Sequence, residues 1–413
     1  MIKAMALQRY RGFVDEAVLE MAPVTLLFGR NSAGKSALLR ALPLMAASAG
    51  PARPNRTGPL ALEHGAAMGA SYSEIRSSLS PRNDLVVRLS WGDPNALEVE
   101  YHMRDITDLS RTGQVIETFE VRASGQVVLE TRIDLEIGQH PVEAEAGHLR
   151  FDGLRPVSVG ELSPDKVGVL QTVQAALDRF ESSVDWLGPL RAPIPRRTKP
   201  LSNPTVLDDG AGTVEFLALS SNRDILRWVN DRTHEMFGHR LELRTTADDV
   251  KLVAQFPNGH EADLADVGSG ASQTIPALTH IARVATGRAG GRIVALEQPE
   301  AHLHADAEAV LGECIARAVA GAPASSTGER PVLIVESHSE NLLLALQLAV
   351  IERRLSPDDV VVYWVSRRDR GAVAEKHKFD VHGRPDPPWT SGVFSETTEL
   401  ARRVVNARRR TLT

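Results

Sequence analysis

The residues with the clearest chemical capacity lie in the run Gly29-Arg-Asn-Ser-Ala-Gly-Lys-Ser36, which fits the pattern G-x-x-x-x-G-K-[ST]. Its two glycines let the backbone turn without a Cβ in the way, so that successive N–H groups can face a phosphate. In such a loop Lys35 would reach the β- and γ-phosphates, and the hydroxyl of Ser36 would ligate Mg²⁺. The run therefore predicts a binding site for ATP, or another nucleoside triphosphate, and a magnesium ion.

Two neighbouring elements must position this loop. The apolar stretch Val24-Thr-Leu-Leu-Phe28 predicts a buried strand before it, and Ala37-Leu-Leu-Arg-Ala-Leu42 predicts a helix after it. A strand, a glycine loop and a helix N-terminus in this order form the phosphate cradle known as a P-loop. The residues expected around the nucleotide here are Gly29, Arg30, Asn31, Ser32, Ala33, Gly34, Lys35, Ser36 and Ala37.

Three later stretches carry polar residues where a strand ends or a turn begins. The apolar strand predicted at 293–296 ends in Glu297, which is the pattern of a Walker B carboxylate that holds Mg²⁺. The strand at 332–335 leads into Ser337-His338-Ser339, and Gly268-Ser-Gly270 forms a glycine turn that opens a helix. Because parallel strands place their carboxyl ends at one edge of a sheet, we expect the two strand ends to meet the P-loop there.

The order of these motifs resembles that of the ABC/SMC-class AAA-family ATPases grouped as OLD-like ("overcoming lysogenization defect"). Within that group the chain is most similar to stand-alone ATPases that lack a Toprim domain and carry a C-terminal domain of unknown function. The motifs that carry the resemblance are the P-loop, Val267-Gly-Ser-Gly-Ala-Ser-Gln273, Glu297-Gln-Pro-Glu-Ala-His-Leu-His304 and Glu336-Ser-His-Ser339. The opening Leu7-Gln-Arg-Tyr-Arg-Gly-Phe13, the stretch Leu187-Gly-Pro-Leu-Arg191 and parts of 378–394 are also similar to the family.

This resemblance implies roles for individual residues. Gly268, Ser269 and Gly270 would form the signature turn, which faces the γ-phosphate of ATP bound to a second subunit. His338 would be the switch histidine that contacts the γ-phosphate or the attacking water. Arg11 would approach the nucleotide, although a plain surface arginine is an equal alternative. For His338 the alternative is a histidine at a strand end that caps the following helix, although Ser339 could cap that helix by itself.

The chain departs from the usual pattern after the Walker B strand. Most such ATPases have Asp-Glu where this chain has Glu297-Gln298. Glu297 can still hold Mg²⁺, but Gln298 cannot accept a proton, so the usual general base is missing. Either hydrolysis is slow, or Glu300, Glu297 or His338 substitutes for the base.

The resemblance and the strand pattern together predict an α/β fold. We expect an ABC-type ATPase head with a mixed or parallel sheet that carries the P-loop, an antiparallel β lobe and a helical signature lobe. Short alternating runs between Leu85 and Phe151 favour the β lobe, and the apolar strands of the last third favour a parallel sheet. The predicted domains are 1–84 (first ATPase half), 85–165 (β lobe), 166–262 (helices and a hairpin) and 263–413 (second ATPase half).

Bulk properties fit a cytoplasmic protein. The chain has 413 residues, a net charge of −6 and a single cysteine, Cys314, which lies in a helical apolar pattern and suits the core. No stretch is apolar for long enough to span a bilayer, so we expect no membrane contact. The charge argues against a basic coat for nucleic acid, but not against a local patch.

The function expected from the resemblance is that of an ATP-driven conformational switch. Two heads would sandwich ATP and form a homodimer or a higher homo-oligomer, and a separate effector would act beside it in bacterial anti-phage defence. The alternatives are a DNA-repair or nucleic-acid clamp and an OLD-type nuclease. A nuclease would need a Toprim domain, whereas only about 75 residues follow His338. An SMC-type clamp would need long coiled coils, and no sustained heptad pattern separates the P-loop from residue 266.

Contact with nucleic acid is left open by the sequence. Arg191, Arg196, Arg197 and Lys199 cluster in the proline-rich segment 188–200. Further arginines crowd the C-terminus at 402, 403 and 408–410. Both groups equally suit a solvated surface.

Overall fold

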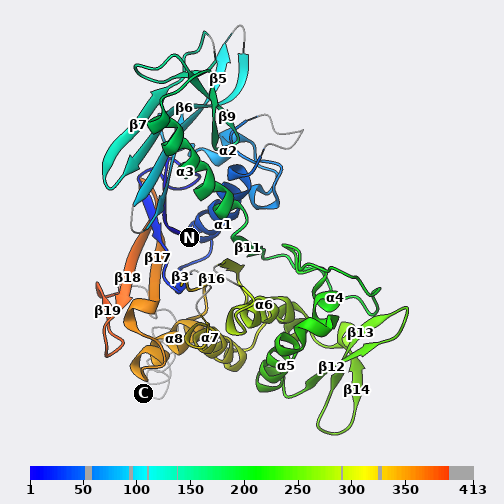
Figure 1. The fold of residues 1–413 in the computed structure, drawn as a ribbon. Helices are drawn as coiled ribbons and strands as arrows, with labels where there is room; N and C mark the ends of the chain where they lie inside the picture. The colour runs from blue at the N-terminus through cyan, green and yellow to red at the C-terminus, as the bar shows by residue number, and fades with distance from the viewer. Residues whose placement is uncertain are drawn as a thin grey trace, which may run out of the picture.

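The structure, a computed structural model, describes residues 1–51, 58–92, 96–108, 111–136, 138–289, 292–323 and 328–389. A central sheet lies between an antiparallel β lobe, drawn at the top of Figure 1, and a lobe of helices, drawn at the bottom. The C-terminal arginines and the Gly392–Phe394 stretch that the sequence singles out lie outside the described residues.

The central sheet is mixed. Within the described residues its strands follow the order β11 (Val184–Leu187), β15 (Ile293–Glu297), β16 (Val332–Ser337), β3 (Val24–Phe28), β17 (Val360–Arg368), β18 (Gly371–Phe379) and β19 (Pro385–Asp386). The strands from β11 to β17 run parallel, whereas β18 and β19 add antiparallel pairs at the edge. The predicted α/β fold with a mixed sheet is confirmed.

Both faces of this sheet are buried, which explains why its strands read as continuous apolar runs. Alternate residues enter two separate cores: Leu27 and Ile334 share a core with helix α1 (Lys35–Ala49), whereas Leu26 and Val335 share the other with the lower helices. Those helices are α6 (Ser269–Ala285), α7 (Ala305–Ala320) and α8 (Glu340–Ile351). The sheet therefore presents one face to α1, and α1 packs there against β3, β15 and β16.

The antiparallel lobe is built on a long meander. Its strand order is β2 (Ala17–Glu20), β1 (Ile2–Gln8), β4 (Asp84–Trp91), β5 (Leu97–Asp108), β6 (Arg111–Ala123) and β7 (Gln126–Arg132). A smaller sheet of β8 (His140–Pro141), β9 (His148–Asp152) and β10 (Arg155–Val159) and the helix α3 (Pro164–Glu181) complete the lobe. Because β1 pairs with β4, the sheet crosses the predicted boundary at residue 84, and the division into four domains stays a prediction.

The lower lobe contains helices and a hairpin from the predicted segment 166–262, whereas α3 of the same segment lies with the antiparallel lobe. Helices α4 (Thr213–Ala218) and α5 (Arg223–Phe237) precede the hairpin of β12 (Arg240–Thr245) and β13 (Val250–Gln255), to which β14 (Glu261–Asp263) adds. Helical turns are also found at α2 (Tyr72–Ile75) and in the 3₁₀ segments at 65–67, 220–222, 264–266 and 357–359. In the described part of the chain, no helix is both long and apolar enough to cross a membrane.

Two details of the sequence reading concern the core. Cys314 is buried on α7, as its helical pattern predicts. The small and Pro/Gly-rich residues from 46 to 60 predict an irregular chain, which is wrong for 46–49, because α1 continues to Ala49. Ala46 and Ala49 are buried in the core, and this packing outweighs the weak local signal of a run of small residues.

Candidate functional site

The parallel strands β15, β16 and β3 lie side by side in the central sheet and end at its carboxyl edge. Glu297 on β15 is the register partner of Glu336 on β16, and Ser337 is the partner of Phe28 on β3. The P-loop begins at the next residue, Gly29. The structure therefore brings the predicted strand ends and the P-loop to one edge, where α/β sheets bind ligands.

The P-loop turns at the two glycines that the motif requires. Gly29 has φ 151°, and a Cβ there would lie 2.2 Å from the carbonyl oxygen of Val365. Gly34 has φ 117° and is the N-cap of α1, and no side chain caps this helix. The first N–H groups of α1 therefore lack a side-chain partner, which favours an anion at this end. Of the remaining loop residues, Ala33 is buried, Ser36 and Ala37 are half-buried, and Arg30, Asn31 and Ser32 are exposed.

Lys35 lies folded against its own loop. Its Nζ donates to the carbonyl oxygens of Gly29 and Arg30 at 2.8 and 2.9 Å, and the residue is only 3% exposed. Burial lowers the pKa of Lys35, while the nearby Glu336 and Glu300 carboxylates act in the opposite direction. The Lys35 ammonium is thus buried within the loop and held by two of the loop's own carbonyl oxygens.

Helix α1 directs two side chains at the two strand-end glutamates. Ser36 Oγ donates to Glu336 Oε1 at 2.7 Å. Arg40, one turn later, donates to Glu297 from Nε at 2.9 and 3.0 Å and from Nη2 at 2.7 Å. The sequence pairs Ser36 with Glu297 on one magnesium ion, but the hydrogen-bond partner of Ser36 is Glu336. The reason is the strand order, since β16 lies between β15 and the P-loop strand β3.

The two glutamates differ in how far their charge is compensated. Glu297 also accepts a hydrogen bond from Trp186 Nε1 at 2.8 Å, so both of its oxygens are engaged. Glu336 is 1% exposed, and among the described residues its Oε2 has no hydrogen-bond partner. Burial raises the pKa of Glu336 to about 7, the Ser36 hydroxyl lowers it in part, and the neighbouring Glu297 raises it further.

Glu300 and His338, both predicted as catalytic, are neighbours. Glu300 Oε1 accepts from Ser337 Oγ at 2.7 Å and from the backbone N–H of His338 at 3.0 Å, and it lies 3.3 Å from His338 Nδ1. Half of the His338 side chain is exposed. Ser339, not His338, caps α8, because its Oγ accepts from Leu342 N–H. The imidazole is therefore held by its backbone and by Glu300, and its ring reaches solvent.

Gln298 has a left-handed backbone with φ 42°, and its N–H donates to the carbonyl oxygen of Glu336 at 2.9 Å. Arg191 braces the same turn: its Nη2 donates to the carbonyl oxygen of Glu297 at 2.7 Å. Burial lowers the pKa of Arg191 to about 10, and the Glu300 and Glu297 carboxylates oppose the shift. The sequence groups Arg191 with a surface basic patch, but the structure buries it as a support for the strand end.

The glycine turn at 268–270, predicted as a signature turn, lies at the start of a helix. Helix α6 begins at Ser269, its N-cap is Gly268, and no side chain caps it. Gly268 and Ser269 are exposed, and a Cβ on Gly268 would meet nothing within 4 Å. Gly270 lies closer to the protein, since a Cβ there would be 2.8 Å from the carbonyl oxygen of His302. The start of α6 therefore offers backbone N–H groups on an open surface.

Arg11 lies beside the P-loop in a cavity of about 520 Å³. The cavity is lined by Ser32, Ala33 and Gly34 of the loop and by Arg11, Arg76 and Arg367, among others. The guanidinium of Arg11 donates through Nη2 to the carbonyl oxygen of Ala67, and within the described residues its buried Nε has no partner. Three arginines thus line a space next to the P-loop, and the contact of Arg11 with a nucleotide stays a prediction.

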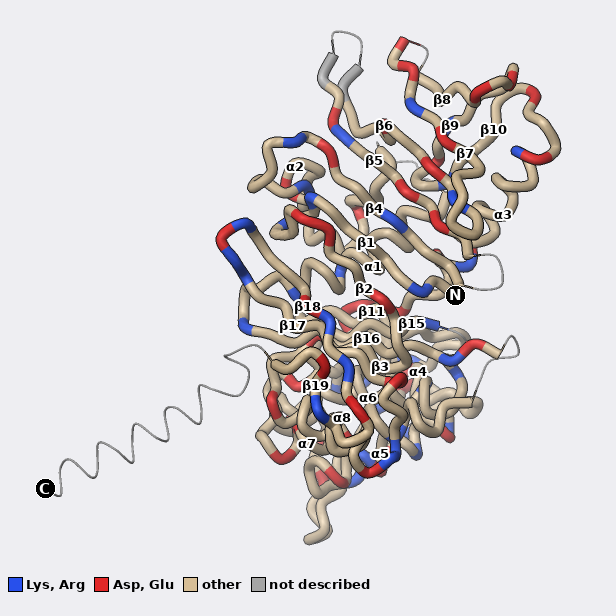
Figure 2. Tube along the Cα trace, turned by 90° about the vertical axis from the view of Figure 1, so that its left-hand side faces the viewer, with Lys and Arg blue, Asp and Glu red and all other residues tan. Residues whose placement is uncertain are grey.

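The basic segment 188–200 carries less free charge than its composition indicates. Besides the buried Arg191, Arg196 forms an ion pair with Asp266, and Arg197 lies 3.5 Å from Asp249. Figure 2 shows acidic and basic residues interspersed over both lobes. The described surface therefore gives little support for a continuous path for nucleic acid.

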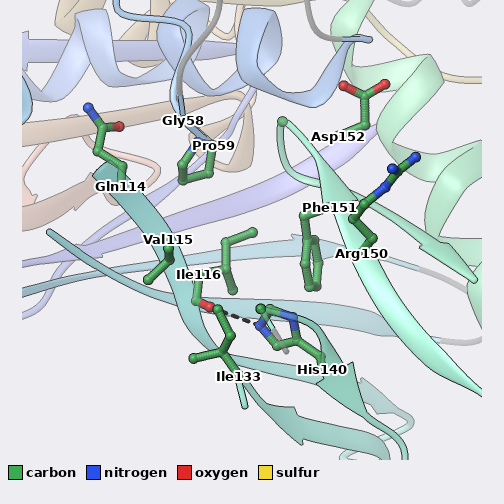
Figure 3. A pocket seen from close by; sticks show the side chains of 12 residues that line it. Gly58, Pro59, Gln114, Val115, Ile116, Ile133, His140, Arg150, Phe151 and Asp152 are labelled. Carbon is green, nitrogen blue, oxygen red and sulfur yellow. Dashed lines mark hydrogen bonds between the residues drawn. The ribbon is translucent and has the colours of Figure 1, made fainter. Parts of the chain in front are cut away.

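A separate cavity of about 290 Å³ opens in the antiparallel lobe (Figure 3). His140 lies against it, donates through Nε2 to the carbonyl oxygen of Ile116 at 2.8 Å, and meets Phe151 edge to face. None of the predicted site residues lines this cavity. It is therefore distinct from the P-loop region.

Sequence reasoning missed Glu336, Arg40 and Trp186 as residues of the site. Glu336 directly precedes the predicted strand end Ser337-His338-Ser339. This position is the sequence feature that could have indicated it. Arg40 follows Ser36 by one helical turn, so it shares a helix face with Ser36. No local pattern marks Trp186, which reaches Glu297 from the neighbouring strand β11.

Comparison with known proteins gives one family match. Residues 208–345 match a family described as "AAA domain, putative AbiEii toxin, Type IV TA system". No curated protein matches the chain with significant sequence similarity. The matched residues include the signature turn, Glu297 and His338 but not the P-loop, which the sheet brings to them from the N-terminal part of the chain.

Several solved structures of SMC heads are similar in fold at low identity. The head domain from Thermotoga maritima shares 11% identity, with a TM-score of 0.44 over 91% of this chain and 98% of that one. A head bound to the C-terminal winged-helix domain of ScpA shares 11%, with a TM-score of 0.49 over 92% and 98%. A Pyrococcus furiosus head with an extended coiled coil, bound to the C-terminal domain of ScpA, shares 11%, with a TM-score of 0.47 over 99% of each. Structural similarity at 11% identity does not indicate a function. Among these comparisons, only the AAA match over residues 208–345 bears on the function of this chain.

Proposed function

We propose that this protein is an ATPase of the ABC/SMC-like AAA class that binds ATP, hydrolyses it slowly and dimerises in response. One observation carries the proposal: the P-loop, Glu336 and the Glu300–His338 pair lie at the same carboxyl edge of a parallel sheet. The AAA match over residues 208–345 supports the ATPase class.

The residues at this edge suit ATP with magnesium. The uncapped start of α1 and the Lys35 ammonium would bind the phosphates. Arg11, whose buried Nε has no partner in the described chain, lines the cavity beside the P-loop and would lie near them. Oxygen ligands such as Ser36 and a nearby carboxylate suit Mg²⁺, which partly neutralises the phosphate charge when bound. The motif and the geometry thus agree on the ligand class.

The dimer would form through the start of α6. Gly268 and Ser269 are exposed there, and the uncapped N–H groups of the helix suit a phosphate brought by a second copy of the chain. The OLD-like resemblance supports this arrangement, in which each head completes the site of the other.

Slow hydrolysis would follow from Gln298. Its amide can orient a water molecule but cannot take its proton. Glu300 and His338, whose Oε1 and Nδ1 atoms lie 3.3 Å apart, are the groups that would accept the proton in its place. The closed ATP-bound state would therefore be long-lived, as suits a switch rather than a motor.

The biological role we propose is that of a sensor or regulator that acts with a separate effector in bacterial anti-phage defence. The OLD-like resemblance supports it. In cells that carry the protein and its neighbouring genes, we expect reduced phage plating, which Lys35→Ala should restore. Equal plating with and without the intact genes would refute this role alone.

A nucleic-acid clamp has less support. Arg196 and Arg197 of the basic segment are engaged with Asp266 and Asp249. A clamp would show a DNA affinity that falls steeply with added salt.

Calorimetry with ATP and Mg²⁺ tests the proposed ligand. We expect binding by the wild-type protein and a loss of at least about tenfold in affinity for Lys35→Ala, because charge-assisted contacts to phosphate are lost. Lys199→Ala is the matched control, since Lys199 is an exposed lysine outside the P-loop. Unchanged ATP affinity in a folded Lys35→Ala protein would refute the P-loop assignment.

A further inference from the structure

The two strand-end glutamates face the same helix. Residues alternate between the two faces of a strand, and Ala295 and Ile334, each two positions earlier, belong to the core that includes α1. Glu297 and Glu336 therefore point to the α1 face and, as register partners on neighbouring parallel strands, lie side by side. Ser36 and Arg40 are one turn apart on α1, so each of them lies over one glutamate.

Glu297 is fully engaged by protein groups. Arg40 binds both of its oxygens, and Trp186 Nε1 donates to Oε1. The Arg40 and Glu297 side chains are 16% and 1% exposed, so this is a largely buried ion pair. To bind a cation, Glu297 would have to give up hydrogen bonds and leave Arg40 without its partner, which is costly at a buried position.

Glu336 has the opposite character. It lies on the strand next to the P-loop strand, its Oε1 already receives the Ser36 hydroxyl, and its Oε2 is buried. Within the described chain that second oxygen has no hydrogen-bond partner, although the residue is 1% exposed. A buried carboxylate oxygen without a donor calls for a positive ligand.

We propose that Glu336, and not Glu297, is the carboxylate that acts with Ser36 on the divalent cation. Glu297 is a positioning residue on β15: it binds Arg40 of helix α1 and Trp186 of strand β11, and so holds both elements against its own strand. A hydroxyl and a carboxylate beside nucleotide phosphates form an all-oxygen environment, which suits a hard cation such as Mg²⁺ or Mn²⁺. This inference rests on the proposed function, because it concerns the cation that accompanies bound ATP.

Mn²⁺ titration followed by electron paramagnetic resonance tests the assignment without any need for activity. The full-length protein is saturated with a non-hydrolysable ATP analogue, and wild type is compared with Glu336→Gln and Glu297→Gln. We expect Glu336→Gln to weaken Mn²⁺ binding at least about tenfold, the size found even for groups one step removed from a metal. Its affinity for the metal-free analogue should stay unchanged. Glu297→Gln should keep the Mn²⁺ affinity and instead lower the unfolding temperature.

Glu336→Asp provides a second measure if Glu336→Gln does not fold. It keeps the charge but shortens the side chain, so it should weaken Mn²⁺ binding while it leaves the fold intact. Loss of Mn²⁺ binding in Glu297→Gln, together with wild-type binding in either Glu336 variant, would overturn the assignment. Calorimetry on the wild type separates the two proposals: a protein that binds no nucleotide refutes the proposed function as well, whereas one that binds it normally leaves only this inference at stake.

Discussion

Gln298 is the residue that sets the expected pace of the reaction. A general base typically contributes about 10²- to 10⁴-fold to a rate, and glutamine-dependent nucleotide hydrolases are slow until they are assisted. We therefore predict turnover well below about one per second for the isolated wild-type protein. Gln298→Glu should raise it, as measured by phosphate release with saturating ATP and Mg²⁺.

Variants of the two neighbouring groups complete that experiment. Glu300 accepts hydrogen bonds from the Ser337 hydroxyl and from the backbone N–H of His338. Glu300 and His338 are the two side chains that could replace the missing general base. Fast wild-type turnover that survives both His338→Ala and Glu300→Gln would contradict this account of the site.

The Arg40–Glu297 pair makes a prediction about stability. Removal of one partner of a buried ion pair leaves an uncompensated charge and typically costs about 3–5 kcal/mol. We expect Arg40→Ala to lower the free energy of unfolding by that amount in chemical denaturation. Arg317→Ala is the matched control, because Arg317 is about half exposed in its pair with Glu235 and should cost less than about 1 kcal/mol. Equal effects of the two substitutions would contradict the structural role given to Glu297.

At this scale the sequence predicts what a local motif specifies. Gly29, Gly34, Lys35 and Ser36 stand in one contiguous run, and their backbone turn is the one that the motif requires. The carboxylate that meets Ser36 could not be chosen in the same way. That choice depends on which strand lies next to β3, and strand order is a long-range property that no local pattern contains.

Among the helices, α6 carries a group that makes stability depend on pH. His280 is buried on α6, and burial lowers its pKa from 6.5 to about 4, with Arg283 acting in the same direction. Between those values the unfolded chain binds more protons than the folded protein, so stability falls as the pH decreases from about 6.5 to about 4. The loss should reach at most about 3 kcal/mol for this group.

A substitution that cannot titrate tests this prediction. We expect His280→Gln to flatten the pH dependence of the unfolding free energy over that interval, whatever its effect at neutral pH. His382→Gln serves as the control, because His382 is an exposed histidine outside α6. A pH profile as steep in His280→Gln as in wild type would contradict the burial argument.

Most of the elements could be predicted because their patterns are strong. The alternating runs of the β lobe, the apolar strands predicted at 24–28, 293–296 and 332–335, and the hairpin predicted within 166–262 all form. The helix at 35–49 runs past its predicted end, since burial of Ala46 and Ala49 is a tertiary effect. The antiparallel strand β18 was not assigned from the sequence, because its run mixes apolar and charged residues on both faces.

The whole molecule joins parts of the chain that lie far apart in sequence. The P-loop strand β3 inserts between β16 and β17, which come from the last third of the chain. The N-terminal strand β1 pairs with β4 of the β lobe, so both cores contain residues from distant segments. The periodicity of a sequence carries no information on such pairings. The sequence therefore predicts many of the site residues, but not which of them contact one another.

Light scattering with ATP and Mg²⁺ tests the central claim, which is that ATP drives two copies of this chain together through the start of α6. The wild-type protein should be monomeric without nucleotide and should double in mass when both ATP and Mg²⁺ are present. Ser269→Arg, a change at an exposed position, should abolish the dimer and leave the ATP affinity of the monomer unchanged. A wild-type protein that stays monomeric with ATP at every concentration, although calorimetry shows ATP bound, would contradict the claim.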